Sequence, residues 1–297
     1  MADKLTSRIE YLGVQFLAWK MRILPFRCAR LAAGLLGCLA GSLLGIRKKV
    51  ALDNLQQAYP EKSEGELRQI YLGCWRHFMK VGAEMARLPK IDEKFIERWI
   101  NLDAQTVMKE VLSRGKGAIV VSGHFGNWEW MGGGMARVGY PVTYVVTSQT
   151  NRLVEDWMNR MRESVGIQIV SRRNAVKGVL SALKDNRAVA MLCDQDAGEA
   201  GVFVPFFGRS ASTPRGPALF HLKTGAPIVF GSARRDENGI VRLIFEEMKF
   251  EGPTGDREQD EIRIMTQITA RLEKEIRRHP EQWLWLHRRW KSSLILL

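Results

Sequence analysis

A histidine and a glutamate stand five positions apart directly after an apolar run, in the segment Ser-Gly-His-Phe-Gly-Asn-Trp-Glu at 122–129. His124 lies where a buried strand is expected to end, and Glu129 about one turn into the helix that follows. A neutral imidazole can remove a proton from a hydroxyl group, while a carboxylate beside it fixes the tautomer and stabilises the imidazolium that forms. The spacing therefore predicts a His124–Glu129 dyad for general-base chemistry.

A structural interpretation of the same residues stays open, in which His124 caps the helix and Glu129 is a solvated acid in its first turn. Other catalytic patterns are missing from the sequence. It contains no nucleophile elbow, no phosphate-binding Gly-x-x-x-x-Gly-Lys loop and no His-Glu-x-x-His. The four cysteines form no Cys-x-x-Cys pair and no zinc-site spacing, so we expect no metal site and a reducing compartment.

The dyad needs a strand-to-helix turn to hold it, and strands and helices alternate around it. Strands are predicted at 118–122, 142–147, 167–170 and 188–193, with helices between them at 126–138, 151–165 and 174–184. Short apolar strands separated by helices are typical of a mainly parallel sheet covered on both faces. Because ligands bind beyond the carboxyl ends of such strands, the loop after 118–122 is expected to line the site.

The segments before and after this alternating region also contain predicted helices and strands. Helices are predicted at 62–87, 103–113 and 257–278, and a hairpin at 226–234 and 239–248 adds antiparallel strands. We therefore expect an α/β fold with a mixed, mainly parallel sheet flanked by helices. It forms one domain over residues 51–297, preceded by an N-terminal helical extension over residues 1–50.

The N-terminal extension combines positive charge with apolar residues. Of the net charge of +13, residues 1–50 carry +7 and residues 271–297 carry +4. Residues 31–46 contain no charged side chain, and aromatic residues precede them, which is unlike a nucleic-acid-binding arm. The run is shorter than the ~20 residues that cross a bilayer, so it spans with snorkelling or lies in the interface as half of a helical hairpin broken near Pro25. We expect residues 1–50 to be a membrane anchor.

Two alternatives apply to this extension. A buried core helix would also be apolar. A cleavable signal peptide is disfavoured because the apolar run starts only at residue 31 and lacks a small-x-small cleavage site. If the segment is retained, the arginines before it and Arg47-Lys48-Lys49 after it favour the cytoplasmic face.

Four motifs follow one another along the chain: His-x-x-x-x-Glu at 124–129, Asp-Gln-Asp at 194–196, Val-Phe-Val-Pro-Phe-Phe-Gly at 202–208 and Trp-Leu-His-Arg-Arg-Trp at 285–290. In type and order they resemble those of the bacterial late acyltransferases of lipid A biosynthesis, the lauroyl and myristoyl transferases. The resemblance covers about residues 10–292. Glycerol-phosphate acyltransferases share His-x-x-x-x-Asp but carry a Phe-Pro-Glu-Gly-Thr-Arg block that is missing here.

The resemblance implies roles for single residues. His124 would be the general base and Glu129 its partner. Four further residues are expected to support the site or bind substrate: Arg162, with Arg160 as its alternative, Asp194 and Asn127. The nearby His287, Arg288 and Arg289 would form either a donor-binding patch or a membrane-facing edge.

The resemblance also implies the reaction. It is O-acyl transfer from an acyl thioester to a hydroxyl of a membrane glycolipid, expected to be a lipid A precursor, without a covalent acyl-enzyme or a cofactor. The donor would be an acyl carrier protein or acyl-CoA, drawn to the basic surface, and backbone N–H groups near the loop glycines would stabilise the oxyanion. The location would be the cytoplasmic face of the inner membrane. Alternatives are transfer to another glycolipid or lysolipid, and a non-catalytic basic membrane-binding protein.

Overall fold

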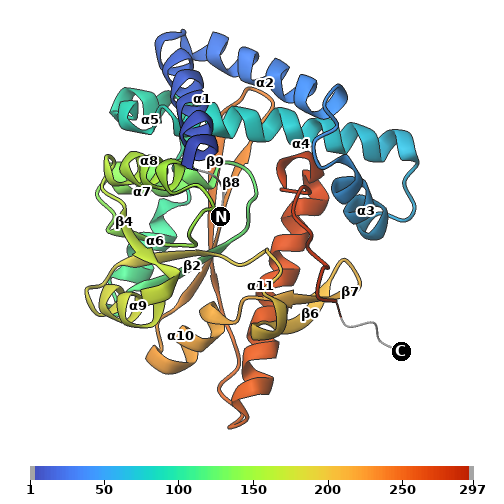
Figure 1. The fold of residues 1–297 in the computed structure, drawn as a ribbon. Coiled ribbons are helices and arrows are strands. Elements are labelled where there is room, and N and C mark those ends of the chain that lie inside the picture. Colours follow the sequence, from blue (N-terminus) through green and yellow to red (C-terminus); the bar gives the residue numbers. More distant parts are fainter. Residues whose placement is uncertain (1–3, 294–297) are drawn as a thin grey trace.

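A seven-stranded sheet forms the centre of the computed structural model, which describes residues 4–293 (Figure 1). Its strand order is β1-β9-β8-β2-β5-β3-β4. The strands are β1 (Ile100–Asn101), β2 (Ala118–Ser122), β3 (Val142–Val146), β4 (Gln168–Ser171), β5 (Ala188–Leu192), β8 (Ile228–Arg235) and β9 (Val241–Met248). All neighbouring strands pair in parallel except β8 and β9, which form the predicted antiparallel hairpin. The predicted mixed, mainly parallel sheet is confirmed.

Both faces of the sheet are covered by helices, so its central strands are apolar throughout. On β2, Ile119 and Val121 pack toward the helices α9 (Ala175–Lys184), α10 (Gly216–Thr224) and α11 (Arg257–Arg278). Ala118 and Val120 pack toward α6 (Gln105–Leu112), α7 (Trp128–Arg137) and α8 (Arg152–Glu163). Alternate side chains of a strand point to opposite faces, which explains the continuous apolar run at 118–122.

A second, two-stranded sheet lies beside α11 and was not predicted. It consists of β6 (Val202–Phe206) and β7 (Arg209–Thr213), which pair antiparallel. Phe206 packs against Trp283 and Trp290 of the C-terminal segment, with ring centroids 5.5 and 5.7 Å apart. The sheet therefore anchors the C-terminal tryptophans next to the carboxyl end of the main sheet.

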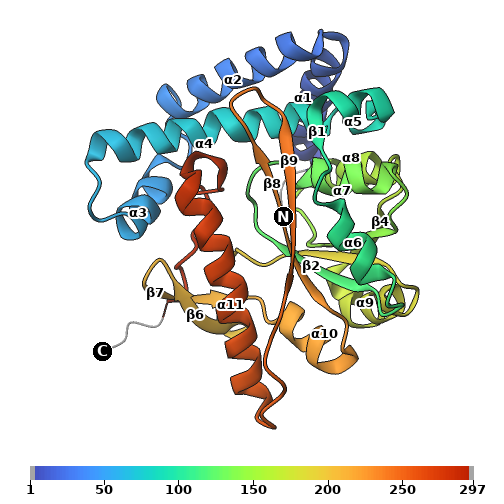
Figure 2. The ribbon, with the colours of Figure 1, turned by 180° about the vertical axis from the view of Figure 1, so that it is seen from behind.

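The N-terminal segment forms a helical hairpin that packs on one long helix. Its helices are α1 (Lys4–Ile23) and α2 (Phe26–Ser42), and the break at Pro25 confirms the expected hairpin. The next helices are α3 (Lys48–Ala58), α4 (Glu64–Met85) and α5 (Glu93–Trp99). Helix α2 lies along α4 so closely that a Cβ at Gly37 would be 2.5 Å from the carbonyl oxygen of Trp75. The β8–β9 hairpin reaches the same two helices, as the view from behind shows (Figure 2).

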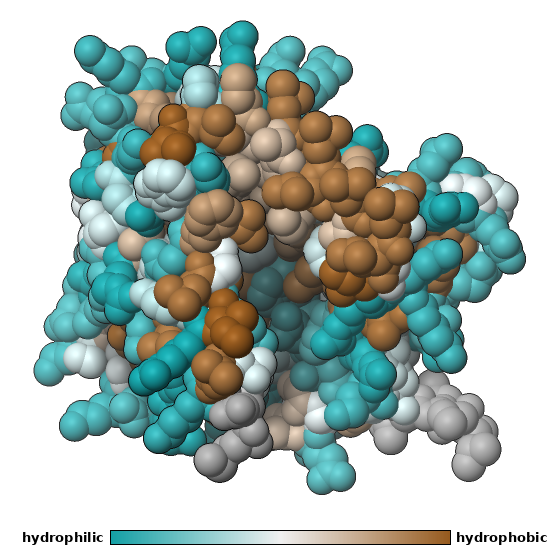
Figure 3. Space-filling model, turned by 45° about the horizontal axis from the view of Figure 1, so that its top comes forward, coloured by the Kyte–Doolittle hydropathy of each residue, from teal (hydrophilic) through white to brown (hydrophobic). Residues whose placement is uncertain are grey.

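The outer face of this helical hairpin is apolar. Among residues 4–293, 17 large apolar side chains are exposed, and 13 of them lie between Leu5 and Ile46. They gather on one face of the molecule, where they border a hollow (Figure 3). None of the helices within residues 4–293 is long and apolar enough to cross a membrane. Helix α2 is thus buried on α4 along one side only, unlike the core helix considered as an alternative.

Candidate active site

His124 follows the carboxyl end of β2, and its partner Asp194 follows the carboxyl end of the neighbouring strand β5. The His124 Nδ1–H donates to Asp194 Oδ1 at 2.8 Å, and the His124 backbone N–H donates to Asp194 Oδ2 at 2.7 Å. The indole N–H of Trp283 also donates to Oδ2, at 2.8 Å. Burial opposes ionisation of Asp194, but the charge of a protonated His124 and these hydrogen bonds outweigh it and lower the pKa of the carboxyl.

The contact with Asp194 decides which nitrogen of His124 is free. A carboxylate only accepts hydrogen bonds, so Nδ1 carries the proton and Nε2 keeps its lone pair. The His124 side chain is 22% exposed, while that of Asp194 is 2% exposed. His124 lines a cavity of about 550 Å³ together with Trp128, Glu129, Tyr144, Arg162 and Gln195. This arrangement suits a general base that faces a substrate cavity.

Glu129 lies in the same cavity but has a different partner from the one predicted. Its carboxylate accepts two hydrogen bonds from the Arg162 guanidinium, at 2.6 and 3.0 Å, and one from the indole of Trp128 at 3.0 Å. Among residues 4–293, no hydrogen bond joins Glu129 to His124. The predicted His124–Glu129 dyad is therefore wrong as a direct pair, because Asp194 occupies the Nδ1 side of the imidazole.

The two candidate arginines of α8 differ in burial. Arg162 is 9% exposed, and its ion pair with Glu129 outweighs the burial that would lower the pKa of the guanidinium. Arg160 is exposed to solvent. The geometry thus favours Arg162 over Arg160 as the arginine of the site.

Asn127 does not lie where a substrate could touch it. The residue is fully buried and caps α7, with its Oδ1 accepting from the Trp130 backbone N–H at 3.0 Å. Its Nδ2 donates to Glu84 Oε2 at 2.7 Å. The predicted substrate contact of Asn127 is corrected to a structural role, because both of its side-chain polar atoms are used within the protein.

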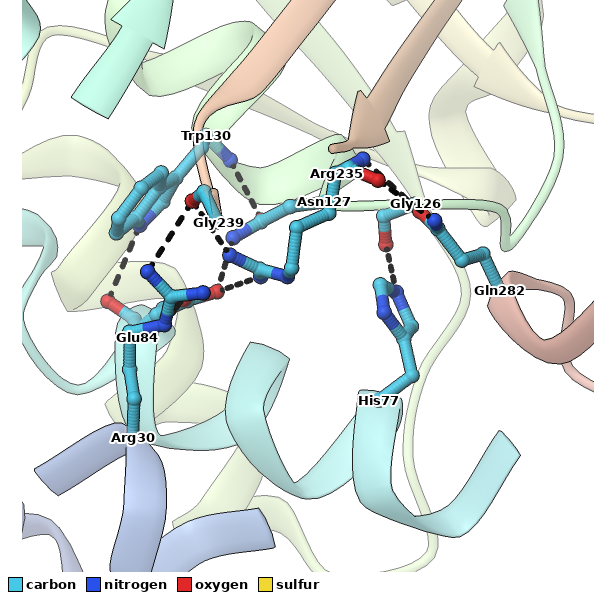
Figure 4. A network of polar contacts seen from close by, with 9 residues as sticks. All are labelled: Arg30, His77, Glu84, Gly126, Asn127, Trp130, Arg235, Gly239 and Gln282. Carbon is cyan, nitrogen blue, oxygen red and sulfur yellow. Dashed lines mark hydrogen bonds and ion pairs between the residues drawn. The ribbon is translucent and has the colours of Figure 1, made fainter. Parts of the chain in front are cut away.

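The loop that carries His124 is held from behind by buried polar contacts (Figure 4). Gly126 has φ of +61°, and a Cβ there would lie 2.0 Å from the carbonyl oxygen of Ala233, so only glycine fits. The Gly126 N–H donates to the Gln282 carbonyl at 2.9 Å, and its own carbonyl accepts from His77 Nε2 at 2.9 Å. Burial, with a smaller effect from Arg235, lowers the pKa of His77 to about 3, so this imidazole is neutral.

Three backbone N–H groups of this loop have partners within the protein. Those of His124, Phe125 and Gly126 donate to Asp194, Gly123 and Gln282, respectively. The positive end of α7, which begins at Trp128 directly after the loop, lies at the same place. Of the loop glycines, Gly126 therefore has its N–H in use, and the source of the oxyanion donors stays a prediction.

The arginine and histidine side chains of the motif at 285–290 mainly contact other parts of the protein. Arg289 is 1% exposed and donates to the Ser212 carbonyl and to Thr213 Oγ1, which fixes β7. His287 Nε2 accepts from the Asp196 backbone N–H at 3.1 Å. Of His287, Arg288 and Arg289, only Arg288 is exposed. The expected role of Arg289 in a surface patch is therefore corrected to a structural one, in which its buried guanidinium supports β7. Trp283, which the sequence did not single out, is the third donor to Asp194.

The part of the chain that the structure describes contains no group of three or more histidine, cysteine or acidic side chains placed to hold a metal ion.

Known proteins resemble this chain over almost its whole length. Residues 2–292 match the profile of a family described as "Bacterial lipid A biosynthesis acyltransferase". The chain is 28% identical to the lipid A biosynthesis palmitoleoyltransferase of Escherichia coli K12 over 279 residues, or 92% of this chain and 88% of that protein. It is also 28% identical to the lauroyltransferase of that organism, over 96% and 92% of the two chains. A phosphatidylinositol mannoside acyltransferase of Mycolicibacterium smegmatis is 24% identical over 75% of this chain and 71% of that protein.

Proposed function

Because the chain belongs to the bacterial lipid A biosynthesis acyltransferase family and is an acyltransferase, we propose that it moves a fatty acyl chain from an acyl thioester to a hydroxyl of a membrane glycolipid, a lipid A precursor. One observation carries this proposal. The imidazole of His124 is held by Asp194 through Nδ1 and lines a cavity large enough for part of a lipid.

The proposed step begins with proton transfer. His124 Nε2 takes the proton of the acceptor hydroxyl while the hydroxyl oxygen attacks the thioester carbonyl carbon. The resulting tetrahedral oxyanion lies near the positive end of α7. When the carbon–sulfur bond breaks, the imidazolium returns its proton to the leaving thiolate. Asp194 stabilises the imidazolium throughout, as a buried carboxylate does in a catalytic triad.

The other residues of the cavity give it an apolar wall and one buried ion pair. Met131, Val145, Met158 and Leu192 line it beside Glu129. These side chains suit an acyl chain, which is bound by burial of apolar surface. Arg162 and Glu129 balance each other's charge, and we assign them to orienting the polar ends of the substrates next to His124.

The apolar outer face of α1 and α2 supports a location at a membrane surface. Leu31, Leu35 and Leu39 are spaced four residues apart along α2 and are 68%, 66% and 49% exposed. An interfacial helical hairpin buries such a stripe at the boundary of headgroups and acyl chains. With the basic residues of 1–50, this stripe supports our proposal that the anchor lies on the cytoplasmic face of the inner membrane, where an acyl carrier protein or acyl-CoA would supply the acyl group.

The test is a reconstituted transfer reaction. Purified full-length protein in detergent is incubated with an acyl carrier protein thioester or an acyl-CoA and with a lipid A precursor, and the product is detected by mass spectrometry. We expect one added acyl ester on the glycolipid. No product with either donor would contradict the proposed reaction.

A second acceptor class has support of its own. One similar protein is named a phosphatidylinositol mannoside acyltransferase, so a different glycolipid is the alternative acceptor. A panel that includes a mannosylated phosphoinositide and a lysophospholipid separates these cases. Transfer to one of these alone would replace the lipid A precursor as substrate but keep the chemistry.

A further inference from the structure

A second cavity, of about 650 Å³, lies behind the loop that carries His124. It is an open cavity lined by α4, the β8–β9 hairpin and the segment 279–282. His77 and Gln282, which hold Gly126, form part of its wall. The proposed acyl transfer does not use this cavity.

Positive charge in this cavity exceeds the negative charge that can balance it. Side chains of Arg76, Lys80 and Arg234 line it, and no described residue forms a hydrogen bond or ion pair with them. Its lining also contains three carboxylates. Asp236 is paired with Arg242 at 3.0 Å, Glu281 lies 3.9 Å from His279, and Glu237 is exposed. The lining thus holds five lysine and arginine side chains against three carboxylates, an excess of two positive charges.

The buried side chain of Arg235 forms part of the cavity wall. Arg235 is 7% exposed, and its two terminal nitrogens donate to Glu84 and to the Gly239 carbonyl (Figure 4). Its Nε has no hydrogen-bond partner among residues 4–293. Because this Nε is also sealed from solvent, Arg235 offers the cavity its positive charge and no free hydrogen bond.

Lys80 connects the cavity to the helix with the apolar face. Its Cε would lie 3.1 Å from a Cβ at Gly34 of α2, so the ammonium group lies at the junction of α2 and α4. Burial, followed by the charges of Arg235 and Arg30, lowers the pKa of Lys80. An anion bound here would relieve that repulsion.

We propose that this cavity binds a phosphate group, held by Lys80 and Arg234 beside the positive charge of Arg235. A phosphate offers several acceptor oxygens and a charge that matches the excess of cations. The cavity adjoins α2, so the phosphate of an anionic lipid headgroup can reach it from the membrane surface; a soluble phosphate is the other source.

Binding of inorganic phosphate to the full chain in detergent tests the site itself. Isothermal titration calorimetry is run at constant ionic strength on the native protein and on Lys80→Gln and Arg234→Gln. Neither side chain has a hydrogen-bond or ion-pair partner within residues 4–293, so both variants should fold. We expect each substitution to weaken phosphate binding about tenfold. Lys177→Gln removes an exposed lysine of α9, outside the cavity, and should leave binding unchanged.

Vesicles identify the source of the phosphate. Sedimentation is compared for phosphatidylcholine vesicles and for the same vesicles with phosphatidylglycerol. If Lys80→Gln weakens only the binding to phosphatidylglycerol vesicles, while Lys177→Gln does not, the phosphate belongs to a lipid. If it weakens phosphate binding but no vesicle binding, the phosphate is soluble, and the site still stands. Equal phosphate binding by native and variant protein, or none by either, would overturn the proposal. These outcomes do not depend on acyl transfer.

Discussion

Replacing Asp194 by asparagine should inactivate the enzyme by changing the tautomer of His124. Asp194 Oδ2 accepts two hydrogen bonds, from the His124 backbone N–H and from Trp283, whereas Oδ1 accepts one, from His124 Nδ1. The amide oxygen of an asparagine would keep the position with two donors. Its NH₂ group would then face Nδ1, which would have to become the acceptor, so the imidazole proton would move to Nε2. The nitrogen that faces the cavity would no longer accept a proton.

The expected loss follows from the role of the base. General-base catalysis contributes about 10²–10⁴-fold, so kcat should fall by that factor, which corresponds to roughly 3–5 kcal/mol of transition-state stabilisation. The assay is the initial rate of acyl transfer, with thermal unfolding followed in parallel. The fold should persist because asparagine fills the same space and is easier to bury than a carboxylate.

A matched substitution provides the control. Asp156 is exposed on α8, so Asp156→Asn should change neither rate nor unfolding temperature. The tautomer argument would be refuted if Asp194→Asn kept a near-native rate.

Three further predictions concern the surroundings of the site. Glu84→Ala leaves the buried Arg235 and the partly buried Arg30 without their carboxylate and should lower the free energy of unfolding by about 3–5 kcal/mol, measured by urea denaturation. A loss below about 1 kcal/mol would contradict this. Arg162→Ala leaves the Glu129 carboxylate buried without its partner and should strongly reduce the rate of acyl transfer. The exposed Arg160 provides the control, because Arg160→Ala should keep most of the rate. Equal losses of rate in the two variants would be inconsistent with the geometry. Leu39→Glu places a charge on the exposed face of α2 and should reduce vesicle sedimentation without altering thermal unfolding; unchanged sedimentation would argue against this face as the membrane contact.

Local patterns predicted the elements of the fold well because the relevant signals lie within each segment. The helix at 257–278 and the strand at 118–122 have the predicted bounds, since apolar periodicity and burial determine them. The break between the two N-terminal helices lies at Pro25, as predicted. The β6–β7 sheet was missed because Pro205 within β6 argues against a strand, yet it is accommodated at an exposed position of a two-stranded sheet.

The partner of His124 could not be found from local spacing. Glu129 is near in sequence, but Asp194 becomes a neighbour only because β5 pairs with β2, and strand order in a sheet is a non-local property. The family resemblance named Asp194 as supporting the site without giving its contact. Trp283 is still further from His124 in the sequence, and no motif around it indicated a contact with Asp194. The residues of the site were therefore largely predictable, whereas their pairing needed the topology.

The most direct test of His124 as the general base is the rate of acyl transfer by purified His124→Ala. The native enzyme and the variant are compared at the same concentration with an acyl thioester and a glycolipid that carries a free hydroxyl. We expect the variant to lose about 10²–10⁴-fold in rate, while its thermal unfolding and its binding to vesicles stay native. A His124→Ala enzyme that transfers the acyl group at a near-native rate would contradict the mechanism.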